Sequence, residues 1–278
     1  MLELHCHTTF SDGTLTPEQL VRRAIDKGVR ALAITDHDTI AGWPDASVAA
    51  QDHELEIVPG IELSTVHMGR SLHILGFYPD PVRLKAPLQE RVEGRKRRAR
   101  KMADKLSELG YPIVLPDMPG DMAPGRPHIA QALLNAGHVQ SKDEAFQRFL
   151  RDDGPAYVPY EKFTVQEGIT LLKSCGAVPV WAHPFLFRGA TVETVLPELV
   201  AAGLMGIEVY HPHHSPSDQR VLEAYCSQYN LLMTGGSDYH GPAPDDKKGH
   251  HDLNSLDVPL GLLAAVKQAA ADLAAARG

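Results

Sequence analysis

The chain has 278 residues, of which 43% are hydrophobic and 22% are charged, and its formal net charge is -8. This length suffices for one large α/β domain with or without an insertion, and the negative charge argues against a surface that coats nucleic acid. No apolar run approaches the roughly 20 residues of a membrane-spanning helix, and the chain starts directly with an expected strand, so we predict a cytoplasmic protein without a signal peptide.

The first motif is the stretch LELHCHTTFSDG at residues 2–13. A short apolar run ends in His5 and His7, and in a strand residues at this spacing leave the same face, so both imidazoles can point at one spot. Asp12 follows in a Ser-Asp-Gly turn, where Gly13 lets the backbone bend sharply. Imidazoles together with a carboxylate suit zinc, manganese or iron. The alternative is an edge strand with two exposed histidines and a loop aspartate.

The patterns that follow alternate between strand and helix, which predicts a parallel α/β sheet. The further strands are expected at 31–34, 57–62, 72–77, 177–181, 206–210 and 231–234. The helices of this part are expected at 17–27, 44–53, 165–174, 192–202, 217–229 and 260–275. Seven strands with polar residues at their ends predict a (β/α) barrel that lacks one of the usual eight units and has its site at the carboxyl ends.

The alternation stops in residues 81–162, which have no strong strand pattern. We therefore predict a barrel made of 1–80 and 163–278, interrupted by a small helical insertion domain that covers the substrate. The insertion is expected to contain helices at 87–109, 128–136 and 141–150 and a loop at 116–127. Its basic run at 95–101 is expected to be a solvated helix face, with contact to a polyanionic substrate as the alternative.

Residues able to bind metals recur at the expected strand ends. They are His5, His7, Asp12, His37, Glu62, His73, His183, Asp238 and His240. They are too many for one ion, whereas open three-ligand sites with bridging carboxylates would accommodate two or three divalent cations. The alternative for any single member is a loop histidine beside the site. The scattered Cys6, Cys175 and Cys226 argue against disulfides and against a thiolate zinc site.

The motifs HCH with SDG, TDHD, GIE followed by LHILG, AHP and GSDYH resemble those of the PHP (polymerase and histidinol phosphatase) family of metal-dependent phosphoesterases. The resemblance runs from Leu2 to His240. It implies a distorted seven-stranded (β/α) barrel and a site for two to three Mn, Fe or Zn ions. The implied ligands are His5, His7, Glu62 and Asp238 for one metal, Glu62, His73 and His183 for a second, and Asp12, His37 and His240 for a third.

Within the family, the insertion and the sequence Gly125-Arg126-Pro127-His128 resemble the small phosphoesterases that act on 3',5'-nucleoside bisphosphates and on the 5' ends of short RNA. This implies that Arg126 and His128 hold phosphate, whose oxygens the guanidinium fork matches. The alternative for Arg126 is a loop arginine paired with a nearby acid. His211 is expected to contact substrate or to donate a proton, and Asp36 is the other candidate for the acid.

The predicted function is hydrolysis of a nucleotide phosphate monoester, or of short oligonucleotide ends, by a hydroxide activated at the Glu62-linked metals. The alternatives are a histidinol-phosphate phosphatase or another small-molecule phosphatase, an amidohydrolase, and a non-catalytic metal-binding scaffold, which would show gaps in the ligand set. We expect a small nucleotide or short oligonucleotide as the binding partner, no membrane and no stable protein partner. The histidines expected at the surface are His67, His213, His214, His250 and His251.

Overall fold

The structure, a computed structural model, describes residues 1–118, 122–159, 163–242 and 252–276. The chain separates into two compact units, one made of Met1–Lys85 with Phe163–Gly278 and the other of Ala86–Lys162. The long helix α3 (Pro81–Glu108) runs through the first of these boundaries. None of the described helices is both long enough and apolar enough to span a membrane.

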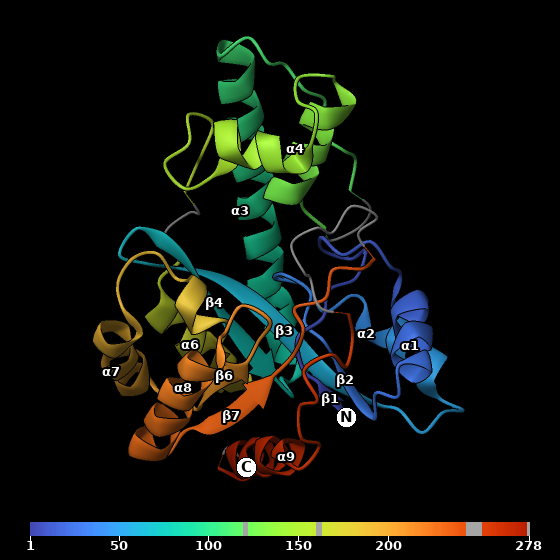
Figure 1. Cartoon of the computed structure of the whole chain (residues 1–278), viewed down its shortest axis with the longest axis vertical. Coiled ribbons are helices and arrows are strands. Elements are labelled where there is room, and N and C mark those ends of the chain that lie inside the picture. The colour runs from blue at the N-terminus through green and yellow to red at the C-terminus, as the bar shows by residue number, and fades with distance from the viewer. Residues whose placement is uncertain (119–121, 160–162, 243–251, 277–278) are drawn as a thin grey trace. The chain divides into compact units, whose positions relative to one another are not determined.

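The first unit is built on a seven-stranded sheet in which the strands follow one another in chain order (Figure 1). The strands are β1 (Leu2–Glu3), β2 (Ala31–Ile34), β3 (Glu56–His67), β4 (Arg70–Phe77), β5 (Val178–Trp181), β6 (Gly206–Tyr210) and β7 (Leu232–Gly235). The first and last strands also meet, because Leu4 N donates to Gly235 O at 3.1 Å and Cys6 forms a parallel bridge with Tyr239. The predicted distorted seven-stranded (β/α) barrel is confirmed, and in the structure it is nearly closed.

Strand β4 departs from the predicted parallel pairing, because it runs antiparallel to both β3 and β5. A two-residue turn, Met68 and Gly69, joins β3 to β4, and both residues have a positive φ. Parallel neighbours need a crossover of about a dozen residues or more, so this short connection permits only a hairpin. The reversal has a functional consequence. It brings the start of β4, with His73, to the end of the barrel where the parallel strands finish, since Ala182 N donates to His73 O at 3.2 Å.

Four helices of this unit begin at a Thr or Ser whose side chain caps the first turn, namely α1 (Pro17–Asp26), α6 (Val165–Ser174), α7 (Val192–Ala202) and α8 (Pro216–Tyr229). In α1 the Thr16 side chain accepts from Gln19 N in a capping box, and Leu20, Val21 and Ala24 are buried. The remaining helices are α2 (Trp43–Ala50) and α9 (Leu262–Ala275). One apolar cluster joins the strands to α9 and a second joins them to α1 and α2.

The second unit contains most of α3, then α4 (Arg126–Asn135) and the short α5 (Lys142–Ala145), which continues as a π-helical turn over Phe146–Leu150. Its apolar core includes Met102, Leu106, Ile129, Leu133 and Phe149. The predicted first helix begins earlier than expected, at Pro81, because Pro87 is accommodated inside it. Part of the predicted loop at 116–127 lies outside the described residues.

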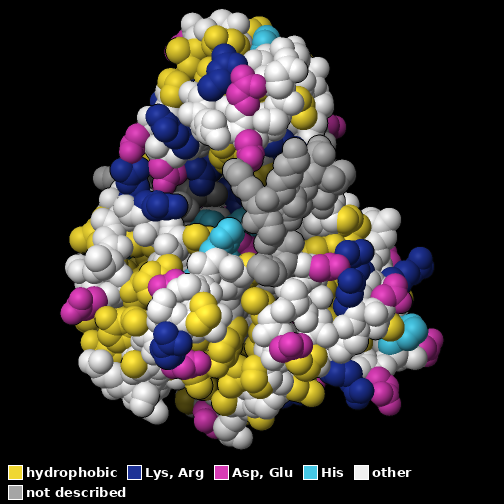
Figure 2. All heavy atoms as spheres, in the orientation of Figure 1, with side chains coloured by type: hydrophobic (Ala, Val, Ile, Leu, Met, Phe, Trp, Pro, Cys, Tyr) yellow, Lys and Arg dark blue, Asp and Glu magenta, His cyan; other side chains and the backbone are white. Residues whose placement is uncertain are grey.

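Arg and Lys side chains are prominent on the helical unit (Figure 2). Within the basic run, however, Arg95 and Arg98 are buried, so the expectation of a purely solvated face is wrong for these two positions. Arg98 Nε donates to Val158 O at 2.7 Å. On the exposed side, Lys96 pairs with Glu93 at 3.0 Å. The alternation of buried and exposed arginines follows from helical periodicity, which turns one side of α3 toward the core of this unit.

Candidate metal centre

The opening motif gains its geometry from the chain that follows β7. His7 N donates to Tyr239 O at 2.9 Å, and Tyr239 N donates to His5 O at 3.3 Å. This pairing keeps residues 5–7 extended beyond the end of β1, so the rings of His5 and His7 leave one face while Cys6 packs into the apolar cluster on the other. Both imidazoles are fully buried.

Asp12 reaches the site because the loop after His7 folds back on itself. Gly13 N donates to Thr8 O at 3.0 Å. A Cβ at Gly13 would lie 2.4 Å from the carbonyl oxygen of His7, so only glycine permits this close approach. The sequence prediction of a tight glycine turn that swings the Asp12 carboxylate back over the strand end agrees with this loop geometry.

Hydrogen bonds to the carboxylate of Asp36 hold the same loop in place. Its carboxylate accepts from Thr8 N at 2.7 Å, from Thr8 Oγ1 at 2.7 Å and from Ser11 Oγ at 2.5 Å. Asp36 is fully buried. Its hydrogen-bonding capacity is thus used to hold the backbone, which gives Asp36 a structural role and does not favour it as the proton donor.

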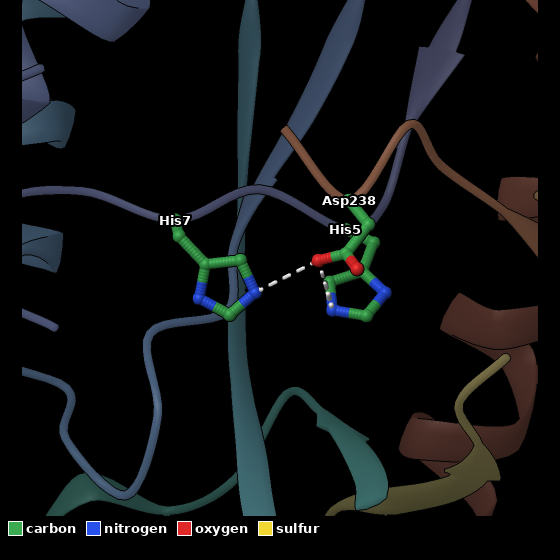
Figure 3. A group of neighbouring side chains, drawn as sticks. All are labelled: His5, His7 and Asp238. Carbon is green, nitrogen blue, oxygen red and sulfur yellow. Dashed lines mark ion pairs between the residues drawn. The ribbon is translucent and has the colours of Figure 1, made fainter. Parts of the chain in front are cut away.

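The first group of ligand candidates joins His5, His7, Glu62 and Asp238. In Figure 3 the two rings approach the same oxygen of Asp238, Oδ1, and the distances from His5 Nε2 and His7 Nε2 are 3.3 and 3.2 Å. Glu62 Oε2 lies 3.2 Å from each of the same two nitrogens. Ligand atoms about 2.0–2.1 Å from a tetrahedral ion lie roughly 3.3 Å apart, so these separations match the edges of such a site.

Glu62 also contacts three further imidazoles. Its Oε1 lies 2.8 Å from His73 Nδ1 and 3.1 Å from His183 Nε2, and its Oε2 lies 3.2 Å from His37 Nδ1. One buried carboxylate therefore faces five histidines that come from four separate segments near the end of the barrel. Such a shared carboxylate is the expected form of a bridge between neighbouring cations.

A separate group forms around Asp12. Its Oδ1 lies 3.3 Å from His240 Nε2 and 3.6 Å from His7 Nδ1, while its Oδ2 lies 3.8 Å from His37 Nε2. The structure thus brings the three residues of the third implied set together, with His7 beside them. His37 lies between the two groups, because its Nε2 faces Asp12 and its Nδ1 faces Glu62.

The donor atoms suit divalent cations. Among the described residues, four groups of three place their ligand atoms within 4.8 Å of one another and include eight of the nine candidates. His73 is the ninth and is held through its short contact with Glu62. His5 Nε2, His7 Nε2 and His37 Nδ1 are buried and find no hydrogen-bond partner among the described residues. Buried polar atoms without partners are costly, and a cation would satisfy them.

The pKa shifts show how strongly these charges interact. Burial alone lowers the pKa of His7, but the carboxylates of Asp238, Glu62 and Asp12 raise it to about 10. Burial lowers the pKa of His37 to about 3 despite those carboxylates, so this ring is neutral near pH 7. Burial alone would raise the pKa of Glu62, yet the surrounding imidazoles hold it well below its usual value. Glu62 and His37 are therefore in the ionised and neutral forms that bind metals, whereas His7 has to lose its proton when a cation binds.

The predicted substrate residues divide between the two units. His211 lies in the barrel unit, buried, with Nε2 3.6 Å from Asp238 Oδ2. Arg126 and His128 belong to the helical unit, at the start of α4. Arg126 NH1 donates to Asp152 Oδ1 at 2.8 Å, so pairing with a nearby acid, the alternative in the sequence analysis, is present. Phosphate binding by Arg126 and His128 stays a prediction.

Two histidines expected at the surface are buried instead. The ring of His214 donates from Nδ1 to Val209 O at 2.9 Å, and burial lowers its pKa to about 4. His67 is buried near Phe187, with 5.9 Å between the ring centroids. His250 and His251 lie outside the described residues. On the face shown in Figure 2 few histidine atoms reach the surface, in keeping with the burial of the ring cluster.

Comparison with known proteins identifies the family. A family model described as the PHP domain matches residues 3–114. The 5'-3' exoribonuclease of Haemophilus influenzae is 34% identical over 266 residues, which cover 93% of this chain and 97% of that protein. This chain belongs to the PHP family. The predictions of family, fold and phosphoesterase class are confirmed.

Two further PHP relatives cover almost the whole chain. The 3',5'-nucleoside bisphosphate phosphatase of Chromobacterium violaceum is 30% identical over 271 residues, 93% of this chain and 94% of that protein. A solved structure from Bifidobacterium adolescentis, assigned to the metal-dependent phosphoesterases, has a TM-score of 0.84 and 32% identity over 96% of each chain. PHP phosphoesterases of this kind require divalent metals, whereas the number and identity of the ions here stay predictions.

Proposed function

We propose that this PHP protein hydrolyses a phosphate monoester of a nucleotide. The substrate we favour is a 3',5'-nucleoside bisphosphate, and the second candidate is the 5' end of short RNA. The observation that carries the proposal is the Glu62 carboxylate, which contacts five imidazoles at 2.8–3.2 Å in a chain whose relatives include a bisphosphate phosphatase and an exoribonuclease. Clustered cations suit phosphoryl transfer because the reaction develops charge on phosphoryl oxygens.

Nine side chains would hold the metals in three groups, and the first two of these groups share Glu62. The first position takes His5, His7, Glu62 and Asp238, the second takes Glu62, His73 and His183, and the third takes Asp12, His37 and His240. When bound, divalent cations supply Lewis acidity that makes water a nucleophile near neutral pH and offsets charge on the phosphoryl oxygens. The buried nitrogens of His5, His7 and His37 support this assignment, since they have no hydrogen-bond partner among the described residues.

His211 is our choice for the proton donor to the leaving alkoxide. The backbone N–H of His213 donates to His211 Nδ1 at 3.2 Å, so a neutral His211 ring carries its proton on Nε2. That atom lies beside the ligand candidate Asp238, at 3.6 Å from Oδ2. A ring held in this tautomer can donate from Nε2 without rearrangement, as general acid catalysis requires.

Arg126 and His128 are proposed to hold a phosphate of the nucleotide. Gly125 N donates to His128 Nδ1 at 3.1 Å, which leaves the proton of a neutral ring on Nε2. Arg126 uses NH1 to bind Asp152 and the Leu150 carbonyl oxygen. These bonds fix the guanidinium plane, and an arginine carries five N–H donors, so further donors remain for phosphate oxygens.

Replacing Arg126 by alanine should raise KM for a nucleoside bisphosphate. Loss of a charge-assisted bidentate contact costs about 2 to 3 kcal/mol, or roughly 30- to 150-fold in kcat/KM. If Arg126 binds the phosphate that does not react, the loss falls mainly on KM, and an aryl monophosphate that lacks this group should be unaffected.

The matched control is Arg148→Ala, because Arg148 is an arginine of the same unit that pairs with Glu144 at 2.6 Å. This variant should keep wild-type kinetics on both substrates. Unchanged kinetics of Arg126→Ala on the bisphosphate would remove the main residue-level support for a nucleotide substrate.

The proposal itself is tested with a panel of substrates. Manganese-loaded protein would be assayed on adenosine 3',5'-bisphosphate, a short 5'-phosphorylated RNA, histidinol phosphate and a dipeptide amide. We expect hydrolysis of the bisphosphate or the RNA with a kcat/KM at least tenfold above that for histidinol phosphate, and none of the amide. A preference for histidinol phosphate would favour the small-molecule phosphatase, and cleavage of the amide alone would refute the phosphoesterase.

A further inference from the structure

One buried carboxylate of the barrel, Glu208, is in contact with the ligand candidates without belonging to them. It sits on β6 within the apolar sequence GIEVY, opposite Thr234 of β7. The side chain is fully buried. An ionised carboxylate in such a position is expensive unless it is paired and hydrogen-bonded, so the identity of its partners indicates what it stabilises.

The first partner of Glu208 is the ring of His5. His5 Nδ1 lies 2.9 Å from Glu208 Oε1. A carboxylate can only accept, so Nδ1 carries the proton and donates it. The lone pair of a neutral His5 ring is then on Nε2, the atom that faces Glu62 at 3.2 Å and Asp238 at 3.3 Å. Glu208 thus selects the tautomer in which His5 can bind a cation.

The second partner is the backbone of His183. This residue has a φ of 33°, in the left-handed region that non-glycine residues rarely adopt. Its N–H donates to Glu208 Oε2 at 2.7 Å. The ring of His183 stacks on that of His5, with 5.8 Å between the centroids, and its Nε2 lies 3.1 Å from Glu62 Oε1. The strained backbone is therefore held where the ring can meet Glu62.

We propose that Glu208 is a positioning residue for both metal positions that share Glu62, an inference that rests on the metal-ligand roles proposed above. One oxygen fixes a ligand of the first position and the other fixes a ligand of the second. One buried side chain on β6 would thereby orient a ligand of each position. A histidine that binds a metal through one ring nitrogen commonly donates its other ring N–H to a carboxylate, and this bond fixes the orientation of the ring.

The test is the cation affinity of Glu208→Gln. A glutamine amide has one acceptor oxygen and one donor nitrogen, so it cannot accept from both His5 Nδ1 and His183 N. We expect roughly 10- to 100-fold weaker binding of the two cations around Glu62, while the group of Asp12 and His240 still binds one. Metal-free protein would be titrated with zinc against a chromophoric chelator, and its fold checked by circular dichroism.

A matched control is Glu3→Gln. Glu3 is also a fully buried glutamate of the barrel, but it accepts from the backbone N–H groups of Ser237 and Asn254 at 2.9 and 2.6 Å, and in the part of the chain that the structure describes it forms no hydrogen bond to a ligand ring. Its loss should lower Tm and leave zinc affinity unchanged. Wild-type zinc affinity in Glu208→Gln, or an equal loss of affinity in Glu3→Gln, would overturn the proposal.

Two additional measurements test the role of Glu208 even if Glu208→Gln does not fold. If Glu208→Gln does not fold, Glu208→Asp keeps the charge but shortens the reach, and the same selective loss of zinc is expected; wild-type affinity there would contradict the proposal. In zinc-loaded protein labelled with ¹⁵N-histidine, His5 should show a protonated Nδ1, which Glu208→Gln should alter. All these experiments measure cation binding or the tautomer of His5, and none measures hydrolysis. The role of Glu208 can therefore be refuted while nucleotide hydrolysis is confirmed, and hydrolysis can be refuted while the role of Glu208 is confirmed.

Discussion

Glu62→Gln should abolish detectable hydrolysis and remove more than one equivalent of bound metal. Both Glu62 oxygens are in use, because Oε1 contacts His73 and His183 and Oε2 contacts the histidines of the opening motif. An amide in its place keeps the volume but turns an N–H₂ donor toward one of these groups, where a ligand oxygen is needed. Elemental analysis after reconstitution with manganese, together with kcat/KM on a nucleoside bisphosphate, measures both effects.

Asp12→Asn is the companion variant, because Asp12 belongs only to the group of His37 and His240. It should lose about one equivalent of metal and leave the cations around Glu62 in place. Turnover should fall less than in Glu62→Gln. Equal metal loss in the two variants would show that the groups are not separate, and the division of ligands proposed here would have to be abandoned.

His211→Gln should lower kcat on a nucleoside bisphosphate by about 10²- to 10⁴-fold, the usual contribution of a general acid. The same change should have a much smaller effect on 4-nitrophenyl phosphate, because an aryl oxide leaves without being protonated. This contrast separates proton donation from a structural role, which would slow both substrates alike. Metal content should remain at the wild-type level.

The control for this experiment is His53→Gln, since His53 is an exposed histidine that follows α2 and is placed in no part of the site. It should keep wild-type rates on both substrates. An equal loss of rate on the alkyl and aryl esters in His211→Gln would contradict the assignment of His211 as the donor.

The strands and the opening motif could be read from the sequence because local patterns determine them. Apolar runs end in polar residues, and the HxH spacing places both rings on one face whenever the chain is extended. The same periodicity could not show that β4 runs antiparallel, since direction depends on the connection. The available signal was the connection between the two expected strands, residues 63–71, which is too short for a crossover helix.

The parts of the site that sequence reasoning missed depend on tertiary contacts. Glu208 is separated from His5 by 203 residues along the chain, so no local sequence pattern predicts that the two side chains are in contact. A charged residue inside the apolar run GIEVY was the one signal, because a buried carboxylate requires partners. Pairing of Arg126 with a nearby acid was the stated alternative in the sequence analysis, but the acid itself, Asp152, lies 26 residues away, and periodicity does not indicate it.

The most direct test of the central claim is the metal content of the purified protein after reconstitution with manganese and removal of excess ion. Nine buried or partly buried ligand candidates face one another at 2.8–3.8 Å, and the ring nitrogens of three of them have no hydrogen-bond partner among the described residues, a cost that bound cations would remove. We predict two to three equivalents per chain, together with phosphoesterase activity that a chelator removes and manganese restores. Fewer than one equivalent, or activity that survives complete removal of metal, would contradict a multinuclear metal centre.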